Sequence, residues 1–563
     1  MMKLTSYSRA DLTGDLIAGV VTATLLIPQA MAYSQLAGLP PEIGLYASMA
    51  PPVLYALVGS SRTMAVGPVA VASLMLAAAL GARWTPGSPE YLAGAVVVAG
   101  LVGVFLLVMG LARLGVVANF LSHPVLSGFT NAAALVILVS QLPPLLGISV
   151  PRGSIDQVVA ALAGGLDRMH GATALLGLLA AALLLGVSRL GSRGLQALGV
   201  AAARADVAVR AFPLALVAGA TAAVAAGLAG QGVAVVGEIP RGLPSVALPP
   251  LDPDLWQDLA GPAAAIALVS FVESLSIARV LGARRRQKVV ADRELLGLGL
   301  ANTGAALTGA SPVCGGFSRS VVNFEAGART QLAGVVTAVM IGLTALLLTP
   351  LFHDLPVAVL AAIVVVSVTT LFDLHTLRLC WRYNRADALA LTATFAAVLA
   401  EGVEAGILVG VVLSAMLFLW RTSRPHTAVV GRVGDTEHFR NVARHAVTTY
   451  PGLLAMRIDE SLYYANAQAL EDLLLSAVAD CERVRHVVLI CSAVNFIDTS
   501  ALETLENLVD ELRDGGVTLH LAEVKGPVMD GLEKVSLLER MRPGRVFLSA
   551  HDAVRALSEP KEP

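Results

Sequence analysis

Charged residues are scarce in this sequence of 563 residues. Asp, Glu, Lys and Arg together form 14% of the chain, against about 25% in an ordinary soluble domain. Hydrophobic residues reach 56%, and the mean hydropathy is +0.73. The formal net charge is only −2, so the chain lacks a strong basic excess and we expect no nucleic-acid partner. The composition instead favours a membrane protein.

Cysteine is also rare. The four cysteines, Cys314, Cys380, Cys481 and Cys491, show neither metal-ligand spacing nor a disulfide framework. We interpret them as packing residues and expect no metal site. The sequence lacks a grouping of nucleophile, metal ligands or cofactor-binding residues, so we expect neither a cofactor nor enzymatic activity. No short charged stretch with a cleavage site precedes the first apolar run, and we expect no removed signal peptide.

Apolar runs recur between Asp15 and Trp420. At about 20 residues per spanning helix they amount to about fourteen crossings, several of them short or broken by Gly and Pro. From Pro425 onward acidic residues outnumber basic ones, and β-rich runs alternate with helical patterns, which is typical of a small α/β domain. We therefore predict a membrane domain over residues 1–424 and a soluble domain over residues 425–563. The β-rich runs are Gly452–Ile458, His486–Ile490 and Val517–Ala522, and the helical patterns are Ala467–Ala479 and Ser500–Arg513.

The charges of the loops predict an orientation. Basic residues follow the sixth, eighth and twelfth apolar runs, whereas the segment from Gly237 to Asp258 is acidic. Because short loops rich in Lys and Arg stay on the cytoplasmic side, we expect both termini in the cytoplasm and the chain in the inner (cytoplasmic) membrane. The alternative, that these charges only solubilise loops, explains their one-sided distribution less well. The basic residues are Arg189 and Arg193, the cluster from Arg284 to Lys288, and Arg378, Arg382 and Arg385.

Two short segments, Arg62–Val71 and Ser311–Val321, predict broken helices. In the first, an apolar helical pattern begins at Pro68, a favourable first-turn residue. In the second, a Gly-Gly pair leads to Ser318 and Ser320, which are candidate N-caps. The two segments occupy corresponding positions of two halves, which indicates an inverted repeat with its site near the midplane. Two helix N-termini that face one point combine free N–H groups with positive dipole ends, so they predict an anion site.

Arg319 lies in the second of these segments. A guanidinium near the bilayer centre costs about 2.5–3.5 kcal/mol on insertion scales, and an oxyanion bound to its planar fork would offset that cost. We therefore interpret Arg319 as a binding residue. The alternatives are a structural salt bridge to Glu273 or a helix-end position from which the side chain reaches the interface. Glu325 and Arg329, four residues apart, predict an ordinary ion pair.

Glu273 is the other costly charge, because it lies within a long apolar run. Burial favours a neutral carboxyl, and a nearby cation favours a charged one. The side chain is therefore a candidate to take up and release a proton. A permanent counter-ion for Arg319 and a sodium ligand are the alternatives.

Polar residues interrupt the apolar span that contains the segment Ile27–Pro41. Such a segment is expected to line a substrate path rather than face lipid, because each polar group in hydrocarbon needs a partner. Gln29 and Tyr33 are four residues apart and share one helix face. Their amide and phenol donors suit an oxyanion. For Tyr33 the alternative is an interfacial belt position.

These motifs resemble those of the sulfate permease (SulP) family of anion transporters, over nearly the whole chain. Ile27–Pro41 resembles the first-span signature, Ala65–Pro68 the third span, Glu273 with the following arginine cluster the eighth, and Phe317–Ser320 with Gly327–Gly334 the tenth. The tail resembles the family's STAS domain. The resemblance implies about fourteen segments in a seven-plus-seven inverted repeat with two half-helices. Spans 1–4 and 8–11 would form a mobile core and spans 5–7 and 12–14 a gate, in homodimers that work by an elevator-like movement.

The resemblance also implies the site and the activity. Glu273 together with the Ser-Arg pair is closer to the proton-coupled sulfate branch than to relatives that carry bicarbonate with sodium. We therefore expect a secondary active transporter, a proton-coupled sulfate symporter. The alternatives are transport of bicarbonate or a dicarboxylate, coupled to sodium or protons, a channel-like anion conduit, or a membrane sensor that signals through its tail. The implied substrate-binding positions are Gln29, Tyr33, Val69, Phe317, Ser318 and Arg319, with Glu273 as the acid of proton coupling.

In the tail, the segment Val494–Ser500 follows a predicted strand and opens a predicted helix. Asp498 is expected to cap that helix. Thr499 matches the place of a phosphorylatable residue in soluble relatives of the STAS domain, so Asp498 and Thr499 are candidate regulatory residues. The alternative is that the domain supports expression, dimer packing or the binding of a cytoplasmic protein partner.

Overall fold

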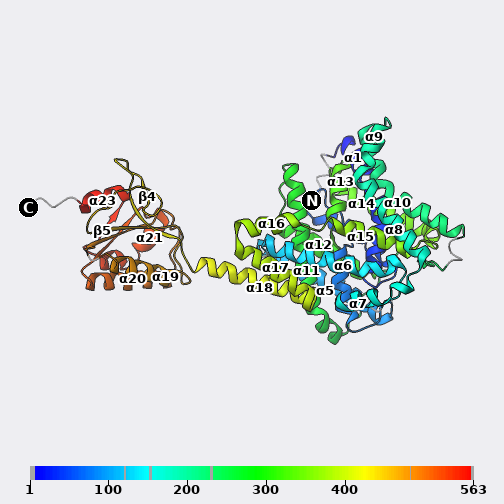
Figure 1. Cartoon of the computed structure of the whole chain (residues 1–563), viewed down its shortest axis with the longest axis horizontal. Helices are drawn as coiled ribbons and strands as arrows, with labels where there is room; N and C mark the ends of the chain where they lie inside the picture. Colours follow the sequence, from blue (N-terminus) through cyan, green and yellow to red (C-terminus); the bar gives the residue numbers. More distant parts are fainter. Residues whose placement is uncertain (1–6, 120–121, 151–154, 228–231, 482, 559–563) are drawn as a thin grey trace, which may run out of the picture. The chain divides into compact units, whose positions relative to one another are not determined.

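The computed structural model describes residues 7–119, 122–150, 155–227, 232–481 and 483–558 (Figure 1). The chain forms two compact units, Met1–Ser414 and Ala415–Pro563, and each unit has a hydrophobic core of its own. Helix α18 (Val403–Thr422) extends across the border between the two units. The domain border that we expected between residues 424 and 425 stays a prediction.

The first unit is helical. Its helices in the first half are α1 (Arg9–Leu36), α2 (Pro41–Tyr46), α3 (Ala50–Val58), α4 (Ala70–Gly81), α5 (Pro89–Leu111), α6 (His123–Leu146), α7 (Ile155–Gly164), α8 (Gly171–Gly186), α9 (Ser192–Ala197) and α10 (Ala202–Ala225). Those in the second half are α11 (Pro253–Arg284), α12 (Ala291–Leu307), α13 (Phe317–Glu325), α14 (Leu332–Leu347), α15 (Val357–Thr369), α16 (Leu374–Tyr383), α17 (Arg385–Glu401) and α18.

Eight helices of the described part are long and apolar enough to cross a membrane, and shorter apolar helices such as α4 and α14 accompany them. If α2 and α3 count as one segment and α7, α9 and α16 are set aside, fourteen segments result, seven in each half. The expected all-α polytopic membrane domain is therefore confirmed. It includes one exception, a short ladder between the strands β1 (Val66–Gly67) and β2 (Cys314–Gly315).

Local sequence determines how the first helix begins and how closely it packs. Ser8 and Asp11 form a capping box at the start of α1, with Ser8 Oγ accepting from the Asp11 N–H at 3.1 Å. In the first half of α1, a Cβ on Gly19 would lie 2.8 Å from the carbonyl oxygen of Ala333 and 2.5 Å from the Cβ of Val336. Because glycine leaves this space free, α14 approaches α1 closely, as small residues permit in membrane helices.

Helix packing repeats between the two halves of the first unit. Helix α1 packs against α14 and α13, and its counterpart α11 packs against α5 and α4. The contact of α3 with α14 corresponds to the contact of α12 with α5 in the other half. In the same way, the contact of α6 with α17 corresponds to the contact of α15 with α8. The ladder between β1 and β2 joins the two halves in antiparallel register, Val66 opposite Gly315 and Gly67 opposite Cys314. This reciprocal pattern is that of an inverted repeat.

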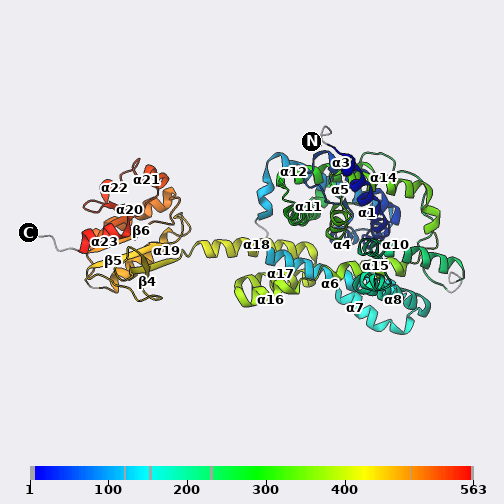
Figure 2. The ribbon, with the colours of Figure 1, turned by 90° about the horizontal axis from the view of Figure 1, so that it is seen from above.

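We name two groups of helices after the expected division. The core group is α1–α5 and α11–α14, and the gate group is α6, α8, α10, α15 and α17, with α18 as the last expected gate span. The division into a mobile core and a gate stays a prediction. Figure 2 shows α11, α12, α3 and α5 of the core group above α6, α15 and α17 of the gate group. The two groups meet where α1 contacts α15 and α10, and where α4 contacts α6.

The second unit is an α/β domain with a six-stranded sheet of order β4-β3-β5-β6-β7-β8. Strands β5 to β8 are parallel, and β3 is antiparallel to both of its neighbours. Helices α19 and α20 cover one face of the sheet, and α23 covers the other (Figure 1). The elements are β3 (Thr427–Arg432), β4 (Phe439–Asn441), β5 (Leu453–Ile458), α19 (Ala467–Ala479), β6 (His486–Ile490), α20 (Thr499–Asp514), β7 (Thr518–Ala522), α21 (Gly526–Leu532), α22 (Leu537–Arg540), β8 (Val546–Phe547) and α23 (Ala550–Ser558).

The predicted α/β tail is therefore confirmed. The interpretation of all four cysteines as packing residues is wrong for Cys481, which is exposed just after α19, whereas the other three are buried.

Candidate functional site

Two half-helices begin at one crossing point in the middle of the first unit. The ladder between β1 and β2 brings the N-termini of α4 and α13 together. Among the described residues no side chain caps either helix from its N-cap position, which is Val69 in α4 and Gly316 in α13. The first N–H groups of both helices therefore remain available as donors, at two positive dipole ends.

Two details of the predicted helix starts are wrong. Helix α4 begins two residues after Pro68, because the backbone of Gly67 is held in the ladder with Cys314. Neither Ser318 nor Ser320 is the N-cap of α13. The Ser320 hydroxyl instead accepts a hydrogen bond from the Ala65 N–H at 3.0 Å.

Buried polar side chains hold the crossing in place. Ser274 accepts from the Gly315 N–H at 2.8 Å. Asn302, which is fully buried, donates to the carbonyl of Val313 and accepts from its N–H, both at 2.9 Å. Sequence reasoning missed these positioning residues, although single polar residues within apolar helices were the available signal.

Arg319 has a buried and incompletely paired guanidinium. The residue is 2% exposed, and its Nη1 donates to the carbonyl of Pro68. Its Nε and Nη2 have no hydrogen-bond partner among the described residues. A Cβ on Gly316 would lie 2.8 Å from Nη2 and 3.0 Å from Nε, so only glycine leaves room for this arrangement. Buried donors are normally satisfied, and the free edge formed by Nε and Nη2 is suited to two oxygens of one anion.

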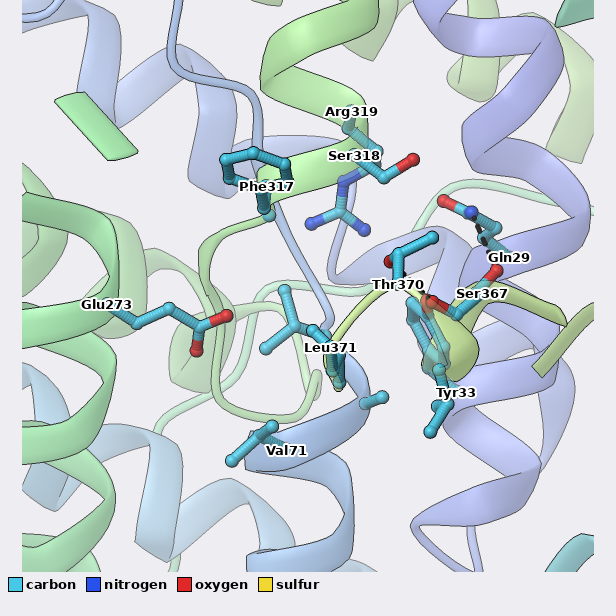
Figure 3. A pocket seen from close by; sticks show the side chains of 14 residues that line it. Gln29, Tyr33, Val71, Glu273, Phe317, Ser318, Arg319, Ser367, Thr370 and Leu371 are labelled. Atoms are coloured by element: carbon cyan, nitrogen blue, oxygen red, sulfur yellow. Dashed lines mark hydrogen bonds between the residues drawn. The ribbon is translucent and has the colours of Figure 1, made fainter. Parts of the chain in front are cut away.

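Arg319 also lines a cavity of about 40 Å³. Its volume corresponds to roughly three water-sized groups, which suits an ion of few atoms. Figure 3 shows that side chains from α1, α11, α13 and α15 converge on it. The structure brings together all seven positions expected from the sequence. The cavity is lined by Gln29, Tyr33, Val69, Ala70, Val71, Glu273, Gly316, Phe317, Ser318, Arg319, Ser367, Val368, Thr370 and Leu371.

The lining differs in accessibility. Gln29 and Tyr33 from α1 are 4% and 7% exposed, whereas Phe317 in the first turn of α13 is 47% exposed. Ser318 is exposed as well. Phe317 and Ser318 are therefore accessible, whereas Arg319 beside them is buried.

Glu273 points toward the cavity from α11 (Figure 3). In the described structure it forms no ion pair with Arg319, whose Nε and Nη2 have no partner and whose Nη1 bonds to Pro68. The structural salt bridge that the sequence left open is therefore not formed. The guanidinium charge remains available to a bound anion, and the carboxyl group remains available to a proton or a cation.

Ser367 and Thr370 line the cavity and were not expected from the sequence. Ser367 lies near the end of α15 and accepts from the Gln29 amide Nε2 at 3.3 Å. The Thr370 hydroxyl donates to the carbonyl of Ser367 at 2.7 Å. Hydroxyls at the end of an apolar run are common, so only the fold reveals their place in the site.

The predicted ion pair between Glu325 and Arg329 is wrong. Glu325 pairs with Arg210 of α10 at 2.5 Å, and Arg329 pairs with Asp11 at 3.4 Å. Helix α13 ends at Glu325, and Gly327 then turns the chain with a φ of +101°. The two residues therefore do not share a helix face.

In the second unit, Asp498 is the N-cap of α20 as expected, and it accepts from the Ala501 N–H at 2.8 Å and the Tyr464 N–H at 2.9 Å. Thr499 begins the helix and is exposed. The cap is therefore confirmed, and the regulatory role of the two residues stays a prediction.

Comparison with known proteins agrees with this arrangement. The model of the sulfate permease family matches residues 12–394, and the model of the STAS domain matches residues 444–553. The chain belongs to the sulfate permease family. It is a multi-pass membrane transporter of that family with a C-terminal STAS domain.

Relatives of this permease align along most of its length. A probable sulfate transporter 4.2 of Arabidopsis thaliana is 37% identical over 553 residues, which cover 96% of this chain and 80% of the relative. A probable sulfate transporter of Mycobacterium tuberculosis is 35% identical over 559 residues, which cover 99% of this chain and 97% of the relative.

Solved structures share the fold of this permease. The murine Solute Carrier 26 family member A9 anion transporter, in the inward-facing state, superposes with a TM-score of 0.87 at 24% identity, covering 98% of this chain and 92% of that structure. The transmembrane domain of a cyanobacterial bicarbonate transporter has a TM-score of 0.60 at 22% identity and covers 72% of this chain and 98% of that domain.

Proposed function

We propose that this permease is a secondary active transporter that carries sulfate together with protons. The observation that supports the proposal is Arg319, a buried cation with two unpartnered donor atoms whose side chain lines a cavity of ionic size. The two relatives described above are named probable sulfate transporters. Both facts favour a small oxyanion as the substrate.

In this proposal the anion is bound by donors alone. Nε and Nη2 of Arg319 bind two of its oxygens as a bidentate pair. The first N–H groups of α4 and α13 and the hydroxyl of Ser318 reach the others. Gln29 and Tyr33 close the cavity from α1, and Val69 and Phe317 contribute apolar walls. A divalent oxyanion then meets one full positive charge and two helix dipoles.

Glu273 provides the coupling to protons. Its carboxylate faces the same cavity as the anion, and two negative groups in one low-dielectric cavity repel each other. Protonation of Glu273 removes this repulsion, so each ligand strengthens the binding of the other by the same factor. A proton gradient would therefore drive the anion inward.

Movement of the core group against the gate group is the proposed route across the membrane. The site residues from α1, α4, α11 and α13 belong to the core group, which would carry them in an elevator-like movement within a homodimer. We further propose an inner (cytoplasmic) membrane location with both termini in the cytoplasm, in line with the basic loops. The STAS domain would support expression, dimer packing or a cytoplasmic partner, and Asp498 and Thr499 are its candidate regulatory residues. Absence of a cofactor and of enzymatic activity stays a prediction.

Uptake into proteoliposomes tests the proposal. An inward proton gradient is expected to drive saturable uptake of labelled sulfate, with bicarbonate and a dicarboxylate as weaker competitors. Dicarboxylates are disfavoured because the cavity is only about 40 Å³. Loss of two charge-assisted hydrogen bonds in Arg319→Ala should weaken sulfate binding at least about hundredfold without unfolding the protein. Arg319→Lys should recover only part of the affinity, since an ammonium lacks the fork.

Three results would contradict the proposal. An ohmic anion current would indicate a channel, and preference for bicarbonate with sodium stimulation would indicate the other carrier type. Unchanged sulfate affinity in a folded Arg319→Ala protein would show that Arg319 is structural.

A further inference from the structure

Few polar contacts join the core group to the gate group. Those between described residues include the ion pair of Arg210 with Glu325. Ser367 on α15 provides further contacts with α1. Its Oγ accepts from Gln29 Nε2 at 3.3 Å within the anion cavity, and its side chain also forms a hydrogen bond with Tyr33. A gate residue therefore contacts two of the residues proposed to bind the anion.

The Gln29 amide is turned the wrong way for an anion. Because Nε2 donates to Ser367, the carbonyl oxygen Oε1 points toward the side of the cavity where Arg319 and Ser318 lie (Figure 3). Among the described residues no donor reaches this oxygen. An acceptor that faces the anion repels it, so the amide has to turn over before Gln29 can donate to a bound oxyanion.

Ser367 can retain its contact with Gln29 through that rotation. A hydroxyl is both a donor and an acceptor. When the amide is turned over, the Ser367 hydroxyl donates to Oε1 and Nε2 faces the anion. Ser367 would then hold the amide in the binding orientation.

We propose that Ser367 is a positioning residue for anion binding that acts from the gate group through Gln29. The proposal rests on the proposed function. Gln29 lies on α1 of the core group and Ser367 lies on α15 of the gate group, so the contact exists in only one relative position of the two groups. Anion affinity is therefore higher when the site is open to one face of the membrane than when it is open to the other.

The experiment measures labelled sulfate uptake from each face, in right-side-out and inside-out membrane vesicles that contain the full chain. Ser367→Ala is expected to raise the apparent KM about two- to tenfold, the effect of one lost hydrogen bond, at one face only. Ser367→Thr should restore the wild-type value, since it keeps the hydroxyl. In a Gln29→Ala background, Ser367→Ala should have a smaller effect than in the wild type, limited to the remaining contact of Ser367 with Tyr33.

Thr369→Val is the matched control. Thr369 lies on the same turn of α15 as Ser367, but it is exposed and is not among the residues that line the cavity. Its hydroxyl donates to the carbonyl of Val366 at 2.6 Å. It should behave as the wild type at both faces. An unchanged KM in Ser367→Ala, an equal change at both faces, or tighter binding would overturn the positioning role while leaving the proposed transport function intact. Absence of sulfate uptake by the unaltered chain would overturn the proposed function itself.

Discussion

Gly316 offers a sharp test of the anion site, because its missing side chain makes room for the guanidinium of Arg319. In Gly316→Ala, the new Cβ would lie 2.8 Å from Nη2 and 3.0 Å from both Cζ and Nε. The backbone at this position has a φ of −91°, which alanine adopts without strain. The substitution therefore displaces the guanidinium without removing its charge or breaking α13.

Displacement of the fork costs at least one charge-assisted hydrogen bond to the anion, about 1.5–3 kcal/mol. Sulfate affinity of the purified protein should accordingly fall about ten- to hundredfold, as measured by equilibrium binding of labelled sulfate. The melting temperature should stay within a few degrees of the wild-type value.

Gly67→Ala is the matched control for Gly316→Ala. Its Cβ also faces the guanidinium from the crossing, but it would lie 3.5 Å from Nη2 of Arg319, an ordinary van der Waals distance. A small effect on affinity is expected. Undiminished binding in Gly316→Ala, or an equal loss in both variants, would refute the inference that the position of the guanidinium determines affinity.

Three further predictions concern coupling, domain independence and pH. Glu273→Gln should retain sulfate counterflow and lose uptake driven by a proton gradient, because the amide cannot release a proton; gradient-driven uptake measured in the same vesicles would disprove the proton-carrier role. A chain that ends at Arg424 should bind sulfate with an affinity within about twofold of the wild-type value, although its expression should be lower. A truncated protein that is folded but does not bind sulfate would contradict this prediction. Burial, followed by the nearby charges of His486 and Arg545, lowers the pKa of His520 to about 4. As the pH falls, the unfolded domain therefore takes up the proton before the folded one does. Urea unfolding of residues 425–563 should show that the free energy of unfolding decreases by roughly 3 kcal/mol between about pH 6.5 and pH 4. His520→Gln should flatten this pH dependence, and an unchanged slope in the variant would contradict the assignment to His520.

The sequence predicted the residues of the site better than their contacts. Arg319 and Glu273 can be recognised in the sequence because a charge within an apolar run is costly and therefore marks a functional or paired residue. Gln29 can be recognised because an amide in such a run needs a hydrogen-bond partner. Their separation could not be predicted, since it depends on how α11 packs beside α13. Ser367 is 338 positions away from Gln29 along the chain, and only the packing of α15 on α1 brings them together.

Local errors have a similar origin. Capping preferences pointed to Ser318 and Ser320, but the start of α13 is fixed by the ladder with the first half of the chain. The pairing of Glu325 with Arg329 followed from helical spacing, and it failed because the helix ends at Glu325. The alternation of strands and helices in the tail was predicted correctly because each of those elements carries its own hydrophobic pattern.

The ladder between β1 and β2 has a consequence for biosynthesis. Helix α4 has 12 residues, about 18 Å of helix, and cannot cross a hydrocarbon layer of about 30 Å by itself. Until β2 is synthesised, the backbone groups of β1 lack their hydrogen-bond partners in a medium that offers no water. The carbonyl of Pro68 likewise lacks its donor, the guanidinium of Arg319. The second half supplies both, so the first half of this chain enters the bilayer incomplete. The anion site is therefore assembled only after the second half has been inserted, since its lining includes residues as late as Leu371.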